Sequence, residues 1–380
     1  MINVSDSTDM RPKVGVDCRL SGIKHAGIGR YIEELVHVVT TDTSIHWILF
    51  FEEEHQLPWV RESDHISIRV VPIRHYTLRE QLIMPIVFGK EKLDLLHVPH
   101  FNVPLLYRKF FVVTIHDLLW HEQRGSYVTT LSPLVYGIKY RGYRFVTNWA
   151  MTHSQAIFVP ARTVQQSIKR LMPSVDERKI HVTYEGVEEK WFEKEQVSRN
   201  KYQGRKEKIL FYTGSLYPHK NVLFVVRSLK QLPEYKLYIS SSRDVFVEHF
   251  LNEVKKHGLS ERVIHLGRLS DDELKTWYEK AFALVQSSLS EGFGLTGIEA
   301  MASGLPVLAS DIAIFKEIYG NAFIAFDPHS EASLVNAVRQ LEKSDYRALV
   351  NNGKKQAQRY SWQRMGEQTL GVYKQFLQHV

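Results

Sequence analysis

The feature that most constrains the fold is the alternation of short β-branched apolar runs with longer amphipathic segments along the whole chain. This alternation is typical of parallel sheets, in which each helix returns the chain to the same edge of the sheet. Strands are predicted at residues 13–17, 45–51, 66–71, 93–97, 111–115, 156–159 and 179–182, and again at 208–212, 235–239, 263–266, 283–286 and 306–309. Helices are predicted at 28–39, 78–87, 133–149 and 161–171, and from near Asn221, Arg243, Asp271, Leu295 and Ile312. The class is therefore α/β.

The chain is also too long for one core. Its 380 residues exceed what a single α/β core usually holds, so two domains are expected. Residues 188–206 are charged and lack apolar periodicity, which makes them the predicted linker. The domains would then span 1–187 and 207–361. A final helix within 362–380 carries apolar positions that predict packing back on the first domain.

Charge and composition leave several partner classes open. The net charge of +7 suits nucleic acid, anionic lipid or phosphorylated small molecules. Basic and aromatic residues mix in the helix predicted at 133–149, which either rests on an anionic membrane or is a solvated face. The sequence shows no signal-peptide pattern and no apolar run of about 18–20 residues. The lone Cys18 fits a reducing compartment. A cytoplasmic protein is expected, with peripheral contact at the inner face of the cell membrane as an open alternative.

The strongest motif is the run Ser-Glu-Gly-Phe-Gly-Leu-Thr-Gly-Ile-Glu at residues 290–299, between a predicted strand and a predicted helix. Gly292 and Gly294 let the backbone approach a ligand closely. The N–H groups at the start of the helix then form a phosphate site. These groups belong to Phe293, Gly294, Leu295 and Thr296. Glu299 lies one turn into the helix, where it would face a ribose, and Glu291 precedes the helix, within reach of a sugar beyond the phosphates.

Glu291 and Glu299, within EGFGL and EAMA, resemble the paired-glutamate motif of glycosyltransferase family 4. The resemblance implies the GT-B fold, in which two Rossmann-like doubly wound domains face each other across a cleft. It also implies retention of anomeric configuration and no need for a divalent metal. Under it, Glu299 binds the donor ribose, Glu291 lies near the transferred sugar, and the backbone of 293–296 holds the diphosphate.

Two further segments of the second half match the same family. The run Gly214-Ser215-Leu-Tyr-Pro-His-Lys220-Asn contains a lysine that the resemblance assigns to the leaving diphosphate. Ser215 stands where a basic residue is usual, so one of two phosphate charges is missing or supplied elsewhere. Gly267 and Arg268 belong to the segment that borders the nucleotide base. Ser270 or Asp271 is expected to cap the next helix.

The first half contributes the opposite wall. In the run 26–31, Gly27 and Gly29 resemble the family loop that closes over donor phosphate or acceptor, while Ile32 removes the third glycine of a dinucleotide fingerprint. His116 and Asp117 end a predicted strand, where α/β proteins place functional groups.

The resemblance assigns His116 to the donor sugar and Asp117 to its orientation. His97 and His100, at the end of another strand, are expected on the acceptor side. Glu185 stands where relatives usually have asparagine.

The predicted activity is a retaining, metal-independent hexosyl transfer from a nucleotide sugar to a glycan or lipid-linked acceptor. No Asp-x-Asp and no cysteine cluster exists, so no metal or cofactor is expected. The Gly-Ile-Gly-Arg-Tyr, His-Asp-Leu and Pro-His-Lys-Asn runs resemble bacterial surface-polysaccharide mannosyltransferases, which favours GDP-mannose as donor. The alternatives are a GT-B phosphorylase or epimerase and a catalytically silent nucleotide-sugar-binding protein. A nucleic-acid-binding function has no recognisable reading motif.

Overall fold

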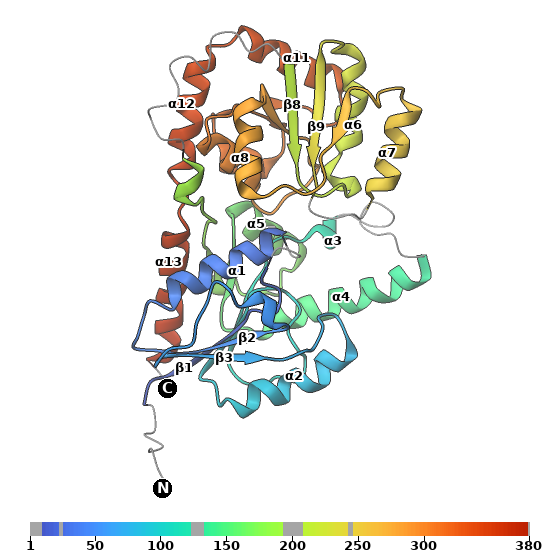
Figure 1. Ribbon diagram of the computed structural model, residues 1–380. Helices are drawn as coiled ribbons and strands as arrows, with labels where there is room; N and C mark the ends of the chain where they lie inside the picture. The colour runs from blue at the N-terminus through green and yellow to red at the C-terminus, as the bar shows by residue number, and fades with distance from the viewer. Residues whose placement is uncertain (1–9, 23–25, 123–132, 193–207, 242–245, 379–380) are drawn as a thin grey trace.

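The computed structural model describes residues 10–22, 26–122, 133–192, 208–241 and 246–378. These residues form two parallel α/β domains, one above the other, with the chain termini at the lower domain (Figure 1). Every described strand pair is parallel, and each domain has its own sheet. The predicted Rossmann-like two-domain class is confirmed.

The first domain holds a seven-stranded sheet in the order β3-β2-β1-β4-β5-β6-β7. The strands are β1 (Lys13–Asp17), β2 (His46–Phe51), β3 (Ile66–Val70), β4 (Leu95–Val98), β5 (Phe111–Thr114), β6 (Ile157–Val159) and β7 (Ile180–Val182). The helices are α1 (Ala26–Val39), α2 (Leu78–Lys90), α3 (Leu119–Glu122), α4 (Pro133–His153) and α5 (Arg162–Leu171). The central strands β1, β4 and β5 are almost wholly buried, which explains their continuous apolar sequences.

The second domain holds a six-stranded sheet in the order β10-β9-β8-β11-β12-β13. Its strands are β8 (Lys208–Thr213), β9 (Tyr235–Ser240), β10 (Val263–His265), β11 (Ala283–Gln286), β12 (Val307–Ser310) and β13 (Phe323–Phe326). The helices are α6 (Val222–Ser228), α7 (Val247–Lys256), α8 (Asp271–Lys280), α9 (Leu295–Ala302), α10 (Ala313–Tyr319), α11 (Glu331–Lys343) and α12 (Tyr346–Ala357).

The last helix, α13 (Trp362–Leu377), leaves the second domain and lies along α1 of the first (Figure 1). Trp362, Met365 and Tyr373 share one apolar core with Trp47 of β2. Gly186 permits the crossing, because a side chain there would overlap the backbone at Trp362. The C-terminal helix therefore forms part of the core of the first domain.

Several details differ from the sequence-based expectation, and the helices α3, α11 and α12 were not predicted. The edge strand β13 was not predicted, because its four residues give too short a run to separate from a loop. The helix α4 continues to His153 instead of ending at Trp149. Of the predicted linker, residues 193–206 lie outside the described part, while residues 188–192 contain the short 3-10 turn η5 (Glu189–Trp191).

Candidate functional site

A cavity of about 1650 Å³ lies between the two domains. Its walls come from loops at the carboxyl ends of strands in both sheets and from the first turns of α1 and α9. Ligands bind at this edge in open parallel sheets. Most of the residues predicted for the site line this cavity: Gly27, His116, Asp117, Gly214, Ser215, Lys220, Arg268, Glu291, Phe293, Gly294, Leu295, Thr296 and Glu299.

The amino end of α9 is shaped by two glycines. Gly294 has a left-handed φ of 92° and caps the helix without a side chain, while the Tyr319 hydroxyl donates to its carbonyl oxygen at 2.7 Å. A side chain on Gly292 would overlap the carbonyl of His116 in the other domain. Leu295 and Thr296, the first two residues of α9, lie at the cavity, while the N–H of Gly297 bonds the Gly294 carbonyl at 3.1 Å. The first N–H groups of a helix have no carbonyl of a preceding turn to bond. This end of the helix suits an anion.

An ion pair lies beside that helix end. The Lys220 Nζ is 2.6 Å from the Glu291 Oε1, and the Ser288 hydroxyl donates to the same oxygen at 2.7 Å. Burial opposes the charge on Glu291, but Lys220 and Ser288 outweigh it and hold the pKa of this carboxyl below its usual value. Asn221, in a left-handed conformation, follows Lys220 and donates to the Pro328 carbonyl, which fixes the loop.

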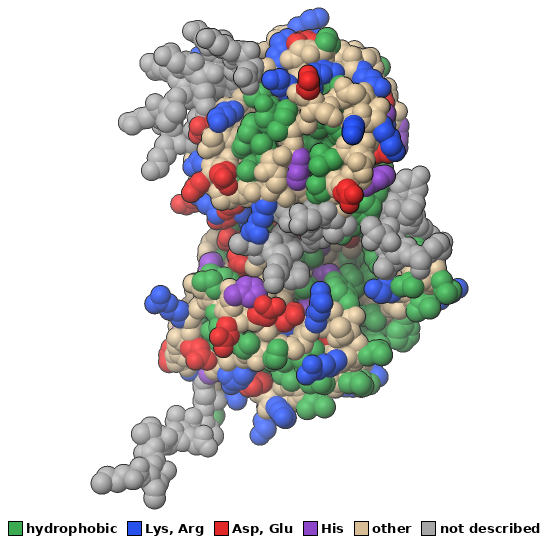
Figure 2. Space-filling model, turned by 45° about the vertical axis from the view of Figure 1, so that its right-hand side comes forward, with side chains coloured by type: hydrophobic (Ala, Val, Ile, Leu, Met, Phe, Trp, Pro, Cys, Tyr) green, Lys and Arg blue, Asp and Glu red, His purple; other side chains and the backbone are tan. Residues whose placement is uncertain are grey.

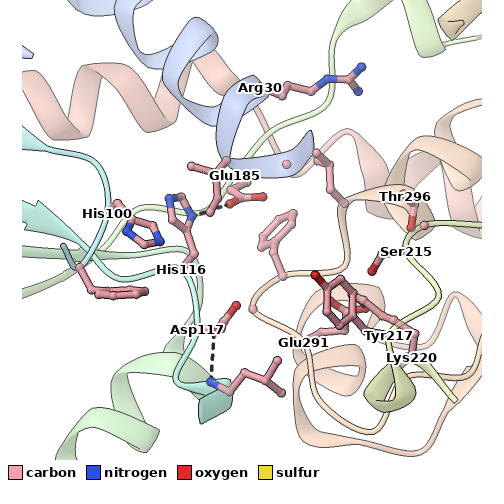
Figure 3. A pocket seen from close by; sticks show the side chains of 18 of the residues that line it. Arg30, His100, His116, Asp117, Glu185, Ser215, Tyr217, Lys220, Glu291 and Thr296 are labelled. Carbon is pink, nitrogen blue, oxygen red and sulfur yellow. Dashed lines mark hydrogen bonds and ion pairs between the residues drawn. The ribbon is translucent and has the colours of Figure 1, made fainter. Parts of the chain in front are cut away.

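His116 faces this pair from the first domain (Figure 3). Its Nε2 donates to the Pro99 carbonyl at 3.1 Å, its Nδ1 is 3.5 Å from the Glu185 Oε1, and the Tyr31 ring packs edge-on against it. Asp117, which was expected to orient His116, instead accepts from the backbone N–H of Leu119 at 3.0 Å. The carboxylate that faces the imidazole is Glu185, which the sequence marked only as a departure from the family pattern.

His97 corrects a sequence-based expectation. It was placed on the acceptor side, but it is fully buried under the sheet, with Nδ1 bonded to the Tyr373 hydroxyl and Nε2 2.8 Å from the Thr114 Oγ1. Burial lowers its pKa to about 3, so the ring is neutral. His100, by contrast, lines the cavity, with the Tyr76 hydroxyl 3.2 Å from its Nε2.

Two of the predicted glycines, Gly29 and Gly267, determine the course of the backbone next to the cavity. A side chain on Gly29 would overlap the carbonyl of Gly22, and Gly267 turns the chain with a φ of 70°. The expected helix cap is confirmed at Ser270, whose hydroxyl accepts from the Glu273 N–H in a capping box at the start of α8.

The third glutamate at the site is Glu299 of α9. Its side chain is 5% exposed, and the guanidinium of Arg30 in α1 contacts its Oε1 from the other domain. Burial raises the pKa of Glu299 to about 7, and Arg30 opposes that rise. Sequence reasoning did not single out Arg30, although it follows Gly29 directly.

Within the described ranges, no three His, Cys, Asp or Glu side chains are grouped to hold a metal ion. None of the helices that the structure describes combines the length and apolar character needed to cross a bilayer.

Comparison with known proteins places this geometry in context. Residues 193–357 match the family described as "Glycosyl transferases group 1". The chain is 28% identical over 339 residues to the O-antigen chain mannosyltransferase RfbU of Salmonella typhimurium, covering 88% of this chain and 84% of that protein.

Solved structures share the fold. Sucrose-phosphate synthase from Thermosynechococcus elongatus superposes with a TM-score of 0.76 at 18% identity, over 97% of this chain and 100% of that one. HepE from Anabaena, in complex with UDP and glucose, gives 0.71 at 16%, over 96% and 99%. The family match and the O-antigen relative support a GT-B glycosyltransferase.

Proposed function

We propose that this protein is a retaining, metal-independent hexosyltransferase that uses a nucleoside-diphosphate sugar. The observation that carries the proposal is the convergence of the α9 amino end, the Lys220–Glu291 pair and Glu299 on one wall of a single cleft, with His116 opposite. These groups would supply a carboxylate that accepts hydrogen bonds from the ribose hydroxyls, a phosphate site and polar groups for a sugar. Each of these is needed to hold a nucleotide sugar.

The donor is proposed to lie along α9. Glu299 accepts from the ribose hydroxyls, the first N–H groups of the helix bind the diphosphate, and Lys220 neutralises the charge that develops as the diphosphate departs. Glu291 and His116 then border the hexose. Since Lys220 already pairs with Glu291, the phosphate would share or displace an existing contact of the lysine.

The proposed reaction breaks the bond between the anomeric carbon and the diphosphate oxygen and forms a bond to an acceptor hydroxyl on the same face. The acceptor proton passes to the departing phosphate oxygen, so atoms and charge balance. Fixed positive groups at that oxygen act without reorganising during the step, which makes electrostatic stabilisation the largest expected contribution. The family resemblance supports the retaining outcome.

We propose mannose from GDP-mannose as the donor, since an O-antigen chain mannosyltransferase is similar over most of the chain. HepE, which shares the fold, was solved with UDP and glucose, so the base and sugar need a direct test. Thermal-shift screening against GDP-, UDP- and ADP-sugars provides it, because a ligand that binds only the native state raises the melting temperature.

The acceptor is proposed to be a glycan or a lipid-linked glycan at the inner face of the membrane. Leu78, Leu82 and Ile86 form an exposed apolar row on α2, and Leu134 and Ile138 form another on α4. Leu78 and Ile138 also line the cavity, so the apolar rows continue from the cleft. Figure 2 shows hydrophobic side chains beside basic ones on this lower part of the molecule.

The reaction assay compares release of nucleoside diphosphate with and without acceptor. We expect release to require acceptor and to survive EDTA, because Lys220 and α9 supply the positive potential at the diphosphate. Acceptor-independent chemistry would favour an epimerase, phosphate-dependent cleavage a phosphorylase, and no turnover a silent binding protein. Loss of turnover in chelator with rescue by manganese would contradict metal independence.

A further inference from the structure

The side chain of Arg30 extends from α1 at the cleft and points away from His116 and Asp117 (Figure 3). The residue before it, Gly29, packs so closely on the Gly22 carbonyl that no side chain fits there. The first turns of α1 are thus held against the glycine loop, which fixes the point from which the arginine extends. Its position is a product of the fold of the first domain.

The guanidinium meets carboxylates from three separate elements. It contacts the Glu299 Oε1 of α9, lies 3.0 and 3.1 Å from the two oxygens of Asp271 in α8, and its Nε is 3.7 Å from the Glu188 Oε1. Lys190, the other cation of the cluster, is engaged with Glu188 at 2.6 Å and Asp271 at 2.8 Å. Within the described cluster, Arg30 is therefore the cation in direct contact with Glu299.

We infer that Arg30 is a positioning residue for the donor nucleotide, reaching across the cleft to hold the Glu299 carboxylate charged and oriented for the ribose. The inference rests on the proposed function, in which Glu299 accepts from the ribose hydroxyls. Arg30 contacts Oε1, which leaves Oε2 for a hydroxyl. Recognition of a donor bound to the second domain then depends on a side chain of the first.

The surroundings of Glu299 explain why it needs this partner. Burial raises its pKa to about 7 while Arg30 is in place, with Asp271 and Glu188 raising it further and Lys190 opposing. Tyr278 of α8 and Tyr319 of α10 are further titratable neighbours of Glu299. A protonated carboxyl accepts less well from two hydroxyls, so the loss of Arg30 weakens ribose binding most at neutral and lower pH.

The test measures binding of GDP and of UDP to the full chain by calorimetry between pH 6 and 9, for wild type and for Arg30→Ala, Arg30→Gln and Arg30→Lys. The control is Arg69→Ala, which removes a surface arginine–carboxylate pair with Glu91 in the same domain. Titration of the nucleotide phosphate is common to all variants and cancels between them. Circular dichroism identifies any variant that fails to fold. If the alanine variant fails to fold, Arg30→Gln and Arg30→Lys are used in its place.

Affinity of the alanine and glutamine variants is expected to fall about tenfold or more at pH 7 and to recover toward pH 9, with the midpoint of the pH dependence moved upward. Arg30→Lys is expected to restore part of the loss. On a Glu299→Gln background, Arg30→Ala should add little, because both act through one carboxylate. A midpoint that does not move, or additive losses, would overturn the inference. If Glu299→Gln itself binds nucleotide like wild type, the proposed ribose role fails instead.

Discussion

At the scale of single residues, the proposed function gives the ion pair of Lys220 with Glu291 a part in both donor binding and chemistry. The lysine is partly exposed to the cleft and 2.6 Å from the carboxylate, so in the free protein its charge is already engaged. As a diphosphate leaves, its negative charge grows, and the interaction with Lys220 strengthens. An interaction that is stronger in the transition state than in the ground state raises kcat.

Lys220→Ala is therefore expected to lower kcat about 100-fold while changing KM much less. The matched control is Lys208→Ala, a lysine of the same domain that pairs with Glu342 on the surface. Steady-state kinetics with saturating acceptor measure both constants. A rise in KM with kcat unchanged would mean that Lys220 binds ground state and transition state equally and has no special role in leaving-group departure.

At the scale of secondary-structure elements, a buried polar chain connects the last helix to the cleft. The Tyr373 hydroxyl of α13 bonds His97 on β4, His97 bonds Thr114 on β5, and Thr114 bonds the hydroxyl of Tyr31 on α1, 3.1 Å away. The ring of Tyr31 in turn packs on His116. The C-terminal helix thus supports the histidine of the candidate site through three intervening residues.

His97 is expected to make the stability of the folded protein sensitive to acid. Burial lowers its pKa from 6.5 to about 3, so between these values the unfolded chain binds a proton that the folded chain does not. The free energy of unfolding therefore falls as pH drops below about 6.5, by up to about 1.4 kcal/mol per pH unit for one such group.

His97→Gln should be less stable than wild type at pH 7, but its free energy of unfolding should fall less between pH 6 and 4. Urea denaturation at several pH values measures this slope, with the exposed His249→Gln as control. An unchanged slope in His97→Gln would show that another group dominates acid unfolding.

The elements also show what sequence alone can and cannot predict. All twelve predicted strands are present, because buried strands of a parallel sheet carry continuous apolar runs that are visible in the sequence. The glycine spacing within residues 290–299 predicted the turn at the amino end of α9, where the phosphate site is proposed. His97 was misplaced because a strand end does not tell which side chain faces the ligand. The pairing of Arg30 with Glu299 joins residues 269 positions apart, and no local pattern encodes it.

At the scale of the whole molecule, the two domains are joined by contacts from several elements. Glu317 of α10 accepts from the backbone N–H groups of Arg162 and Thr163, each at 2.7 Å, and so caps α5 of the other domain. The N-cap residue of α5, Ala161, makes no side-chain capping hydrogen bond of its own. With Arg30 and α13, these contacts hold the two domains together.

The exposed face of α2 and α4 is the one proposed to contact a membrane. The exposed rows of α2 and α4 are accompanied on α4 by exposed Lys139, Arg141 and Arg144, so apolar insertion and attraction to anionic lipid would act together. The full chain should sediment with vesicles that contain anionic lipid and bind vesicles of neutral lipid far less. It should be released in part as salt rises, because salt screens the attraction between the basic side chains and the lipid.

Ile138→Ser combined with Leu82→Ser should lower the bound fraction several-fold. Leu251→Ser, at an exposed leucine on α7 of the other domain, should not. Equal binding by both variants, or binding that ignores lipid charge, would mean that these rows are an ordinary solvated surface and that the acceptor reaches the cleft from solution.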